Sequence, residues 1–179
     1  MTFRNALRAG TAEYHDVVDH LFGRFDMTDR VHYTAFLTGH ARALPAAEQA
    51  LEAAGIARIF PDWPERRRSH LLRADMATLE LVMPPPVALA AFSSDDEIWG
   101  AAYVIEGSKL GGAMLAKRVP EHFPSAYLSY QGPKGAMKAF MDRLDAAAPV
   151  DRERAIAAAR SVFAAFRAAA ELELEKSAF

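Results

Sequence analysis

The stretch AAYVIEGSKLGGAMLAKRV, residues 101–119, reads as one helix but carries Gly107, Gly111 and Gly112 in its middle. Each glycine inside a helix costs about 0.5–1 kcal/mol relative to alanine. Such a cluster indicates either a helix that bends or a helix whose backbone must lie close to a flat partner. Close packing against another helix through small residues would produce the same pattern, so this stretch alone leaves both explanations open.

A second segment, near the N-terminus, places a histidine inside an apolar helical face. Apolar residues recur at helical spacing from Leu7 to Phe25, and His15 falls among them. A histidine in such a place is either a packed core residue or a metal ligand. Asp19, one turn on, favours the ligand, because a carboxylate can accept the proton of the ring nitrogen that faces away from a metal. Arg8, two turns before His15, adds a cation suited to carboxylates.

Together these two segments resemble the heme oxygenases. LRAGTAEYHDVVDHLF, residues 7–22, is similar to the proximal helix of that family. YVIEGSKLGG, residues 103–112, is similar to its glycine-bearing distal helix, especially in the bacterial enzymes associated with bacteriophytochromes. The tracts 62–81 and 154–173 are also similar, so the likeness covers most of the chain.

The resemblance implies an all-α, single-domain fold over residues 1–179, with heme held between the proximal helix and a kinked distal helix. It implies an enzyme that cleaves heme with oxygen and releases biliverdin, carbon monoxide and iron. Heme is then both cofactor and substrate. The electrons would come from an external donor such as a ferredoxin or a reductase. The resemblance leaves two physiological roles open, supply of pigment to a bacteriophytochrome pathway and release of iron.

The resemblance also implies roles for single residues. His15 would be the proximal ligand of the heme iron, with Asp19 supporting it and Arg8 neutralising a heme propionate. Lys138 lies on a helix that would supply further propionate contacts, although a solvated side chain is its simpler interpretation. The distal residues would be Gly107, Ser108, Gly111 and Gly112, and the remaining heme contacts Arg143, which matches with a shift of one residue, and the aromatic Phe163.

Ser108 departs from the family pattern, because many heme oxygenases have an aspartate there that orders water for proton delivery. A serine hydroxyl can still hold water, and similar EGS motifs occur in the bacteriophytochrome-associated group. The departure leaves open a heme oxygenase-like domain that only carries or senses heme, or that binds a protein partner. A ferritin-like di-iron oxidase is disfavoured because no Glu-x-x-His pair occurs in the sequence.

Composition bounds the remaining possibilities. The 179 residues, 51% of them apolar, suffice for one compact core. A net charge of −2 gives no reason to expect nucleic acid or an anionic membrane as partner. The absence of cysteine removes disulfides and thiolate metal sites. No apolar signal segment or spanning run occurs, so we expect a soluble cytoplasmic protein.

The periodic pattern predicts further helices separated by turn signals. His40 is expected to be a packing residue, the run Arg66 to Arg68 a solvated face, and Val82 an inward-facing residue of the third helix. Residues 121–134 are expected to form a loop. The predicted helices are 30–54 with a kink at Pro45, one from Asp62 to the prolines at 84–86, one from Ser93 or Ser94 to Pro120, 135–147 and 150–176.

Overall fold

The computed structural model describes residues 1–177, and the regular structure of this range is entirely helical, as predicted. No helix in this range is both long and apolar enough to cross a membrane. The helices are α1 Phe3–Phe22, α2 Arg30–Ala53, the 3-10 turn η1 Ile56–Arg58, α3 Trp63–Arg66, α4 Ser69–Thr78, α5 Asp95–Ala116, α6 Ala126–Ser129, α7 Ala136–Ala146 and α8 Arg152–Ser177.

Local capping residues explain where the long helices begin. The side chain of Asp29 accepts a hydrogen bond from the backbone N–H of His32 at the start of α2. Ser94 does the same for Glu97 at the start of α5, whose first turn is acidic. The cap at Ser94 matches the sequence signal, and both caps work because short oxygen-bearing side chains satisfy the free N–H groups of a first turn. Once begun, α2 continues through Pro45, and α5 through its three glycines.

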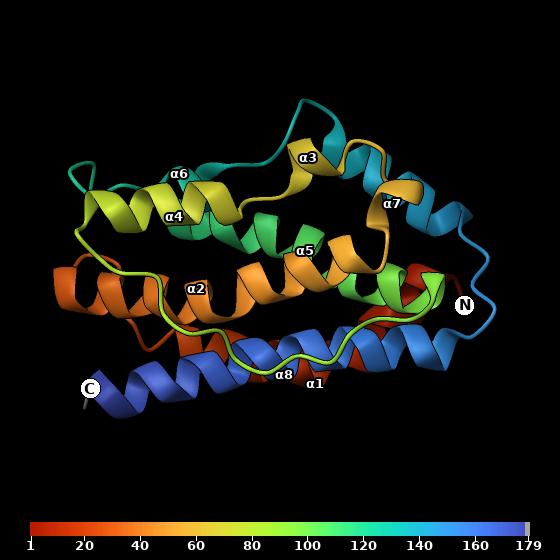
Figure 1. The fold of residues 1–179 in the computed structure, drawn as a ribbon, viewed down its shortest axis with the longest axis horizontal. Coiled ribbons are helices and arrows are strands. Elements are labelled where there is room, and N and C mark those ends of the chain that lie inside the picture. The colour runs from red at the N-terminus through yellow and green to blue at the C-terminus, as the bar shows by residue number, and fades with distance from the viewer. Residues whose placement is uncertain (178–179) are drawn as a thin grey trace.

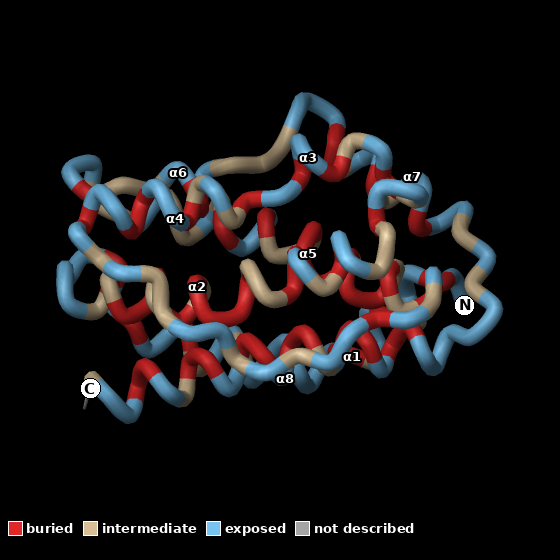
Figure 2. The backbone as a smooth tube through the Cα atoms, in the orientation of Figure 1, coloured by how far each residue is buried: buried red, intermediate tan, exposed pale blue. Residues whose placement is uncertain are grey.

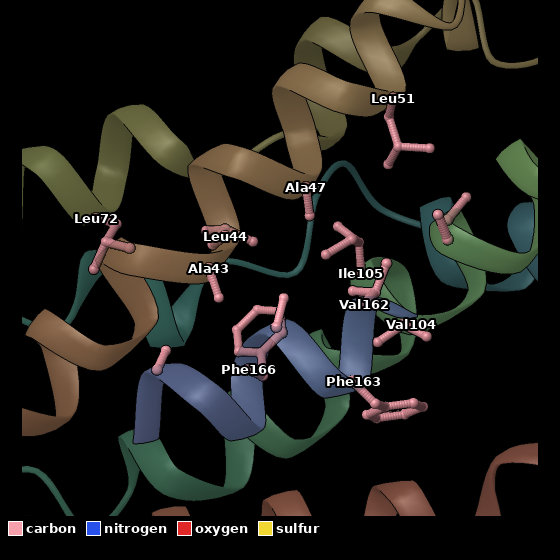
Figure 3. Close-up of a cluster of buried hydrophobic side chains, with 14 of the residues drawn as sticks. Ala43, Leu44, Ala47, Leu51, Leu72, Val104, Ile105, Val162, Phe163 and Phe166 are labelled. Atoms are coloured by element: carbon pink, nitrogen blue, oxygen red, sulfur yellow. The ribbon is translucent and has the colours of Figure 1, made fainter. Parts of the chain in front are cut away.

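The helix α8 forms the axis of the fold, and α1, α2 and α5 all pack along it (Figure 1). Buried positions follow the sides of these helices that face one another (Figure 2). At the centre, Phe166 of α8 meets Ala43 of α2, with Ile105 of α5 nearby (Figure 3). The approach of α5 to α8 requires Gly100, where a Cβ atom would lie 1.9 Å from the carbonyl oxygen of Ala155. α1 and α5 each pack mainly on α8 and have few contacts with each other, and we call the region between their facing sides the gap.

The predicted packing role of His40 is confirmed. Its ring centroid lies 4.4 Å from that of Phe36 and 4.5 Å from that of Phe22. Its Nδ1 atom is 2.7 Å from the hydroxyl of Tyr127. Burial, with a smaller contribution from the charge of Arg68, lowers the pKa of His40 to about 3, so the ring is neutral in the folded protein.

The single helix predicted from Asp62 to the prolines is wrong. It is broken between Arg66 and Ser69, where Glu48 of α2 accepts the backbone N–H groups of Arg68 and Ser69. The chain then leaves α4 at Thr78 and continues as an extended strap, residues 79–93, across α2 and α8 (Figure 1). Because the helix has already ended, Val82 is 87% exposed rather than inward-facing.

The solvated face predicted for residues 66–68 is wrong for two of the three arginines. Arg67 is exposed and pairs with Glu52, but Arg66 and Arg68 are only 2% and 1% exposed. The break between α3 and α4 directs both side chains toward α5, where Arg66 donates to Glu106 and Arg68 donates to Ser108. The predicted loop at 121–134 also contains a short helix, α6.

Candidate functional site

The gap between α1 and α5 begins where a hydrogen bond joins them. The side chain of Thr11 on α1 hydrogen-bonds the hydroxyl of Tyr103 on α5, and burial raises the pKa of that hydroxyl. The two helices run in the same direction (Figure 1). His15 follows Thr11 by four residues and Gly107 follows Tyr103 by four, so each pair shares one side of its helix. His15 and Gly107 therefore lie on the sides that face each other across the gap.

His15 is oriented by acidic neighbours and by one aromatic ring. Its Nδ1 atom lies 3.5 Å from Oδ2 of Asp19 and 3.7 Å from Oδ1 of Asp16. Its ring meets Phe163 of α8 edge-on, with 5.9 Å between centroids, and Phe163 lies at the edge of the buried cluster (Figure 3). The imidazole side chain is nevertheless 57% exposed. Carboxylates beside Nδ1 leave Nε2 as the nitrogen free to bind a metal.

Opposite His15, α5 presents bare backbone flanked by exposed apolar side chains. Cβ atoms built on Gly107 and Gly111 would meet nothing within 4 Å. Leu110 is 52% exposed and Met114 is 71% exposed on the same side of the helix. We call Gly107, Leu110, Gly111 and Met114 the open strip. Contiguous exposed apolar surface of this kind marks a binding site more often than a solvated face.

Gly112 does not belong to this strip, although it adjoins Gly111 in sequence. A Cβ atom on Gly112 would lie 3.1 Å from the carbonyl oxygen of Leu128 and 3.8 Å from Nη1 of Arg68. The absence of a side chain at Gly112 thus lets α6 approach α5. Of the distal glycines predicted from the sequence, the structure brings Gly107 and Gly111 to the gap and places Gly112 on another side.

Ser108 lies between these two environments. It is half-buried, its hydroxyl donates to the carbonyl oxygen of Ile105 at 2.7 Å, and its oxygen accepts from Nη2 of Arg68 at 2.5 Å. The next residue, Lys109, is completely buried. Periodicity could not reveal Arg68 as a partner of Ser108, because the two residues are distant in sequence and Arg68 lies in the break between α3 and α4.

The inner side of α5 carries a buried ionic cluster that the sequence did not reveal. Glu106 lies 2.8 Å from Nη1 of Arg66 and 2.6 Å from Nζ of Lys109. Arg66 also donates to Asp62 at 2.8 Å. Burial lowers the pKa of Lys109, and the charge of Glu106 opposes that shift. The i, i+3 spacing of Glu106 and Lys109 was a visible signal, but such pairs are more often solvated.

Of the predicted cationic heme contacts, Arg8 lies at the end of the gap where Thr11 and Tyr103 are hydrogen-bonded. Although burial raises the pKa of Tyr103, the charges of Arg8 and of Arg4 partly counter that effect, so both cations lie near the hydroxyl. Arg4 also pairs with Asp145 at 3.1 Å. A cationic edge therefore begins two turns before His15 on the same helix.

The two cations predicted on α7 are engaged elsewhere. Lys138 is 81% exposed and lies 2.5 Å from Oδ2 of Asp142. Arg143 donates to the carbonyl oxygen of Ile59, and its guanidinium lies 4.9 Å from the ring centroid of Phe60. The structure does not bring either side chain into contact with His15 or the open strip.

Known proteins are similar to this chain in sequence and in fold. No protein-family model matches the chain. It is 33% identical over 148 residues to a heme oxygenase of Xanthomonas campestris pv. campestris (strain 8004), across 75% of this chain and 86% of that protein. Its fold matches the NO- and CO-bound heme oxygenase of Neisseria meningitidis with a TM-score of 0.83, covering 98% of this chain and 93% of that one at 23% identity.

A second solved structure, the heme oxygenase of Leptospira interrogans, matches with a TM-score of 0.71 and 18% identity, covering 96% of this chain and all of that one. At such low identities the structural matches show the fold alone. The sequence relationship to the Xanthomonas protein goes further, because it extends over most of both chains. The chain belongs to the heme oxygenase family.

Proposed function

We propose that this protein is a heme oxygenase, which cleaves heme to biliverdin and releases carbon monoxide and iron, using oxygen and electrons from an external donor. The observation that carries the proposal is the open strip of α5 opposite His15. Its two glycines leave space where side chains would otherwise stand, and an exposed imidazole faces that space with carboxylates beside Nδ1.

These residues fit heme in shape and in chemistry. The macrocycle is flat and apolar, so it can lie against backbone at Gly107 and Gly111, while Leu110 and Met114 cover apolar surface. His15 would hold the iron through Nε2, with Asp19 accepting the Nδ1 proton and so strengthening the ligand. Bound heme would supply the metal centre that activates oxygen and the carbon framework that is oxidised.

Charge at one end of the gap would orient the propionates. Arg8 and Arg4 near the Tyr103 hydroxyl form a cationic edge, and charge-assisted hydrogen bonds to carboxylates are stronger than neutral ones. Lys138 and Arg143 would contribute only by giving up Asp142 and the carbonyl oxygen of Ile59. Arg8 is therefore the propionate contact that we retain as the principal one.

Titration with hemin tests the proposal. We expect about one hemin per chain, a shifted Soret band, and bleaching with growth of a red biliverdin band under ascorbate and air. The substitution His15→Ala should abolish the histidine-ligated spectrum and the turnover. His20→Ala, an exposed histidine of the same helix, is the matched control and should change neither.

The competing function, a heme carrier or sensor, is favoured by one observation: Ser108 stands in place of a distal acid and its hydroxyl proton is engaged by Ile105. A Soret shift that persists unchanged under ascorbate and air would establish that function instead. Absence of any Soret shift would show that the gap does not bind heme. An unchanged spectrum in His15→Ala would show that another residue holds the iron.

A further inference from the structure

We propose that Arg68 is the group that hydrogen-bonds an anion or a water molecule on the α5 side of the site, and that Ser108 is its positioning residue. The inference rests on the proposed heme site and adds to it a donor that the sequence pattern does not show. It also explains how a chain with serine in place of a distal acid can still hold a polar ligand there.

The guanidinium of Arg68 is buried with most of its donors unused. The side chain is 1% exposed, and among residues 1–177 only its Nη2 atom has acceptors, the Ser108 hydroxyl at 2.5 Å and the Ile105 carbonyl at 3.3 Å. Its Nε atom is buried and has no hydrogen-bond partner within the described part of the chain. Buried donors are normally satisfied, so an unsatisfied guanidinium N–H in the interior indicates a missing ligand.

Comparison with Arg66 shows that this arrangement is not a general property of the buried arginines. Arg66 is buried to the same degree but has two carboxylates, Asp62 and Glu106, each at 2.8 Å. In the described part of the chain no carboxylate pairs with the guanidinium of Arg68, which lies instead over the ring of Tyr127 at 4.9 Å. Because burying an uncompensated charge is costly, Arg68 is poised to accept an anionic partner.

Ser108 is better suited to hold Arg68 than to donate a proton itself. Its hydroxyl proton is directed at Ile105, so toward any other group its oxygen can only accept. Ser108 directly follows Gly107 of the open strip, and it is half-buried. Its oxygen therefore links the edge of the strip to the buried guanidinium.

Azide binding to the ferric hemin complex, followed by optical titration, tests the donor role without turnover. Arg68→Met should weaken azide binding by about tenfold or more, as loss of a charge-assisted hydrogen bond to an anion predicts. The affinity of the ferrous complex for carbon monoxide, a neutral ligand, should change far less. Arg67→Met, which removes the adjacent exposed arginine, is the control and should leave both affinities unchanged.

The positioning role of Ser108 is tested in the same titration. Ser108→Ala should weaken azide binding less than Arg68→Met does, because the Ile105 carbonyl still holds the guanidinium, and Ser108→Thr should restore it. Equal azide affinity in wild type and Arg68→Met would overturn the proposal. So would a loss in Ser108→Ala as large as that in Arg68→Met, because Ser108 would then be the donor.

Stability of the heme-free protein separates this role from a structural one. Since no carboxylate of residues 1–177 pairs with the guanidinium of Arg68, Arg68→Met should unfold at the same temperature as wild type or higher, whereas Arg66→Met should unfold at a clearly lower one. A large loss of stability in Arg68→Met would show that Arg68 is a packing residue and overturn the proposal. Failure of wild type to bind hemin would instead refute the proposed heme site, which the Soret band reports independently.

Discussion

The two sides of α5 differ in how far protein contacts cover them. Toward α1, Gly107 and Gly111 have no neighbour within 4 Å of a built Cβ atom, and the flanking apolar side chains are exposed. Toward α3 and α4, Glu106 and Lys109 are completely or almost completely buried and paired. One helix thus carries an open surface on one side and a dense ionic contact on the other.

The adjacent glycines Gly111 and Gly112 have different surroundings although they belong to the same helix. A Cβ atom at Gly111 would meet no described atom within 4 Å, whereas one at Gly112 would meet the carbonyl oxygen of Leu128 in α6. Rotation by about 100° between successive helical residues is enough to separate the two surroundings. The ionic cluster fixes α5 through its inner side, so the open side can lack protein contacts.

The largest effect should come from breaking the ionic cluster. Glu106→Gln leaves Arg66 without one carboxylate and Lys109 without its only ion-pair partner among the described residues. Removing one partner of a buried ion pair costs about 3–5 kcal/mol. Urea unfolding of the heme-free protein should show this loss.

Lys138→Met is the matched control for that experiment, because it breaks an ion pair that is solvent-exposed. The control should cost about 0–1 kcal/mol. Equal unfolding free energies for Glu106→Gln and wild type would mean that the inner side of α5 does not depend on its charges.

A pair of valine substitutions should separate the two glycines. Gly112→Val forces a side chain against the Leu128 carbonyl and should cost about 1–3 kcal/mol of stability in the heme-free protein. Gly111→Val meets no protein atom, and valine is a better helix former than glycine, so stability should stay level or rise.

The effect on hemin affinity should be the reverse of the effect on stability, with Gly111→Val as the more strongly affected variant. The Gly111→Val side chain occupies the open strip and should weaken hemin binding by at least tenfold in the Soret titration. If Gly111→Val binds hemin as wild type does, the open strip is not the heme surface.

The smallest effect concerns pH and the buried His40. The pKa of His40 is about 3 in the folded protein, against an ordinary value of 6.5. Between these values the unfolded chain binds more protons, so the free energy of unfolding falls as pH falls below 6.5. Each pH unit well inside this window removes about 1.4 kcal/mol.

Urea unfolding of the heme-free protein at pH 7 and at pH 5 measures this dependence. His40→Gln retains an amide that can hydrogen-bond Tyr127 but does not titrate, so its unfolding free energy should depend less on pH. A pH dependence identical to that of wild type would assign the effect to another group.

Much of the fold and part of the site could be predicted from the sequence because the signals are local. The cap at Ser94 and the apolar stripe around His15 require only neighbours within two turns. The pairing of His15 with Asp19 follows from i, i+4 spacing in the same way. Each of these expectations depends on one helix at a time, and the structure has both α1 and α5 where the sequence predicts them.

The positions of Arg66, Arg68 and Gly112 could not be predicted, because partners on other helices determine them. Glu48 on α2 draws the backbone N–H groups after Arg67 out of helical pairing, and that break turns two cations inward where the sequence reads as a solvated run. The sequence by itself therefore determined the helices, the histidine and the glycine-bearing segment. Only the tertiary structure decided which glycines stay open and which arginine keeps unused donors, because these properties arise from distances between helices that no local pattern encodes.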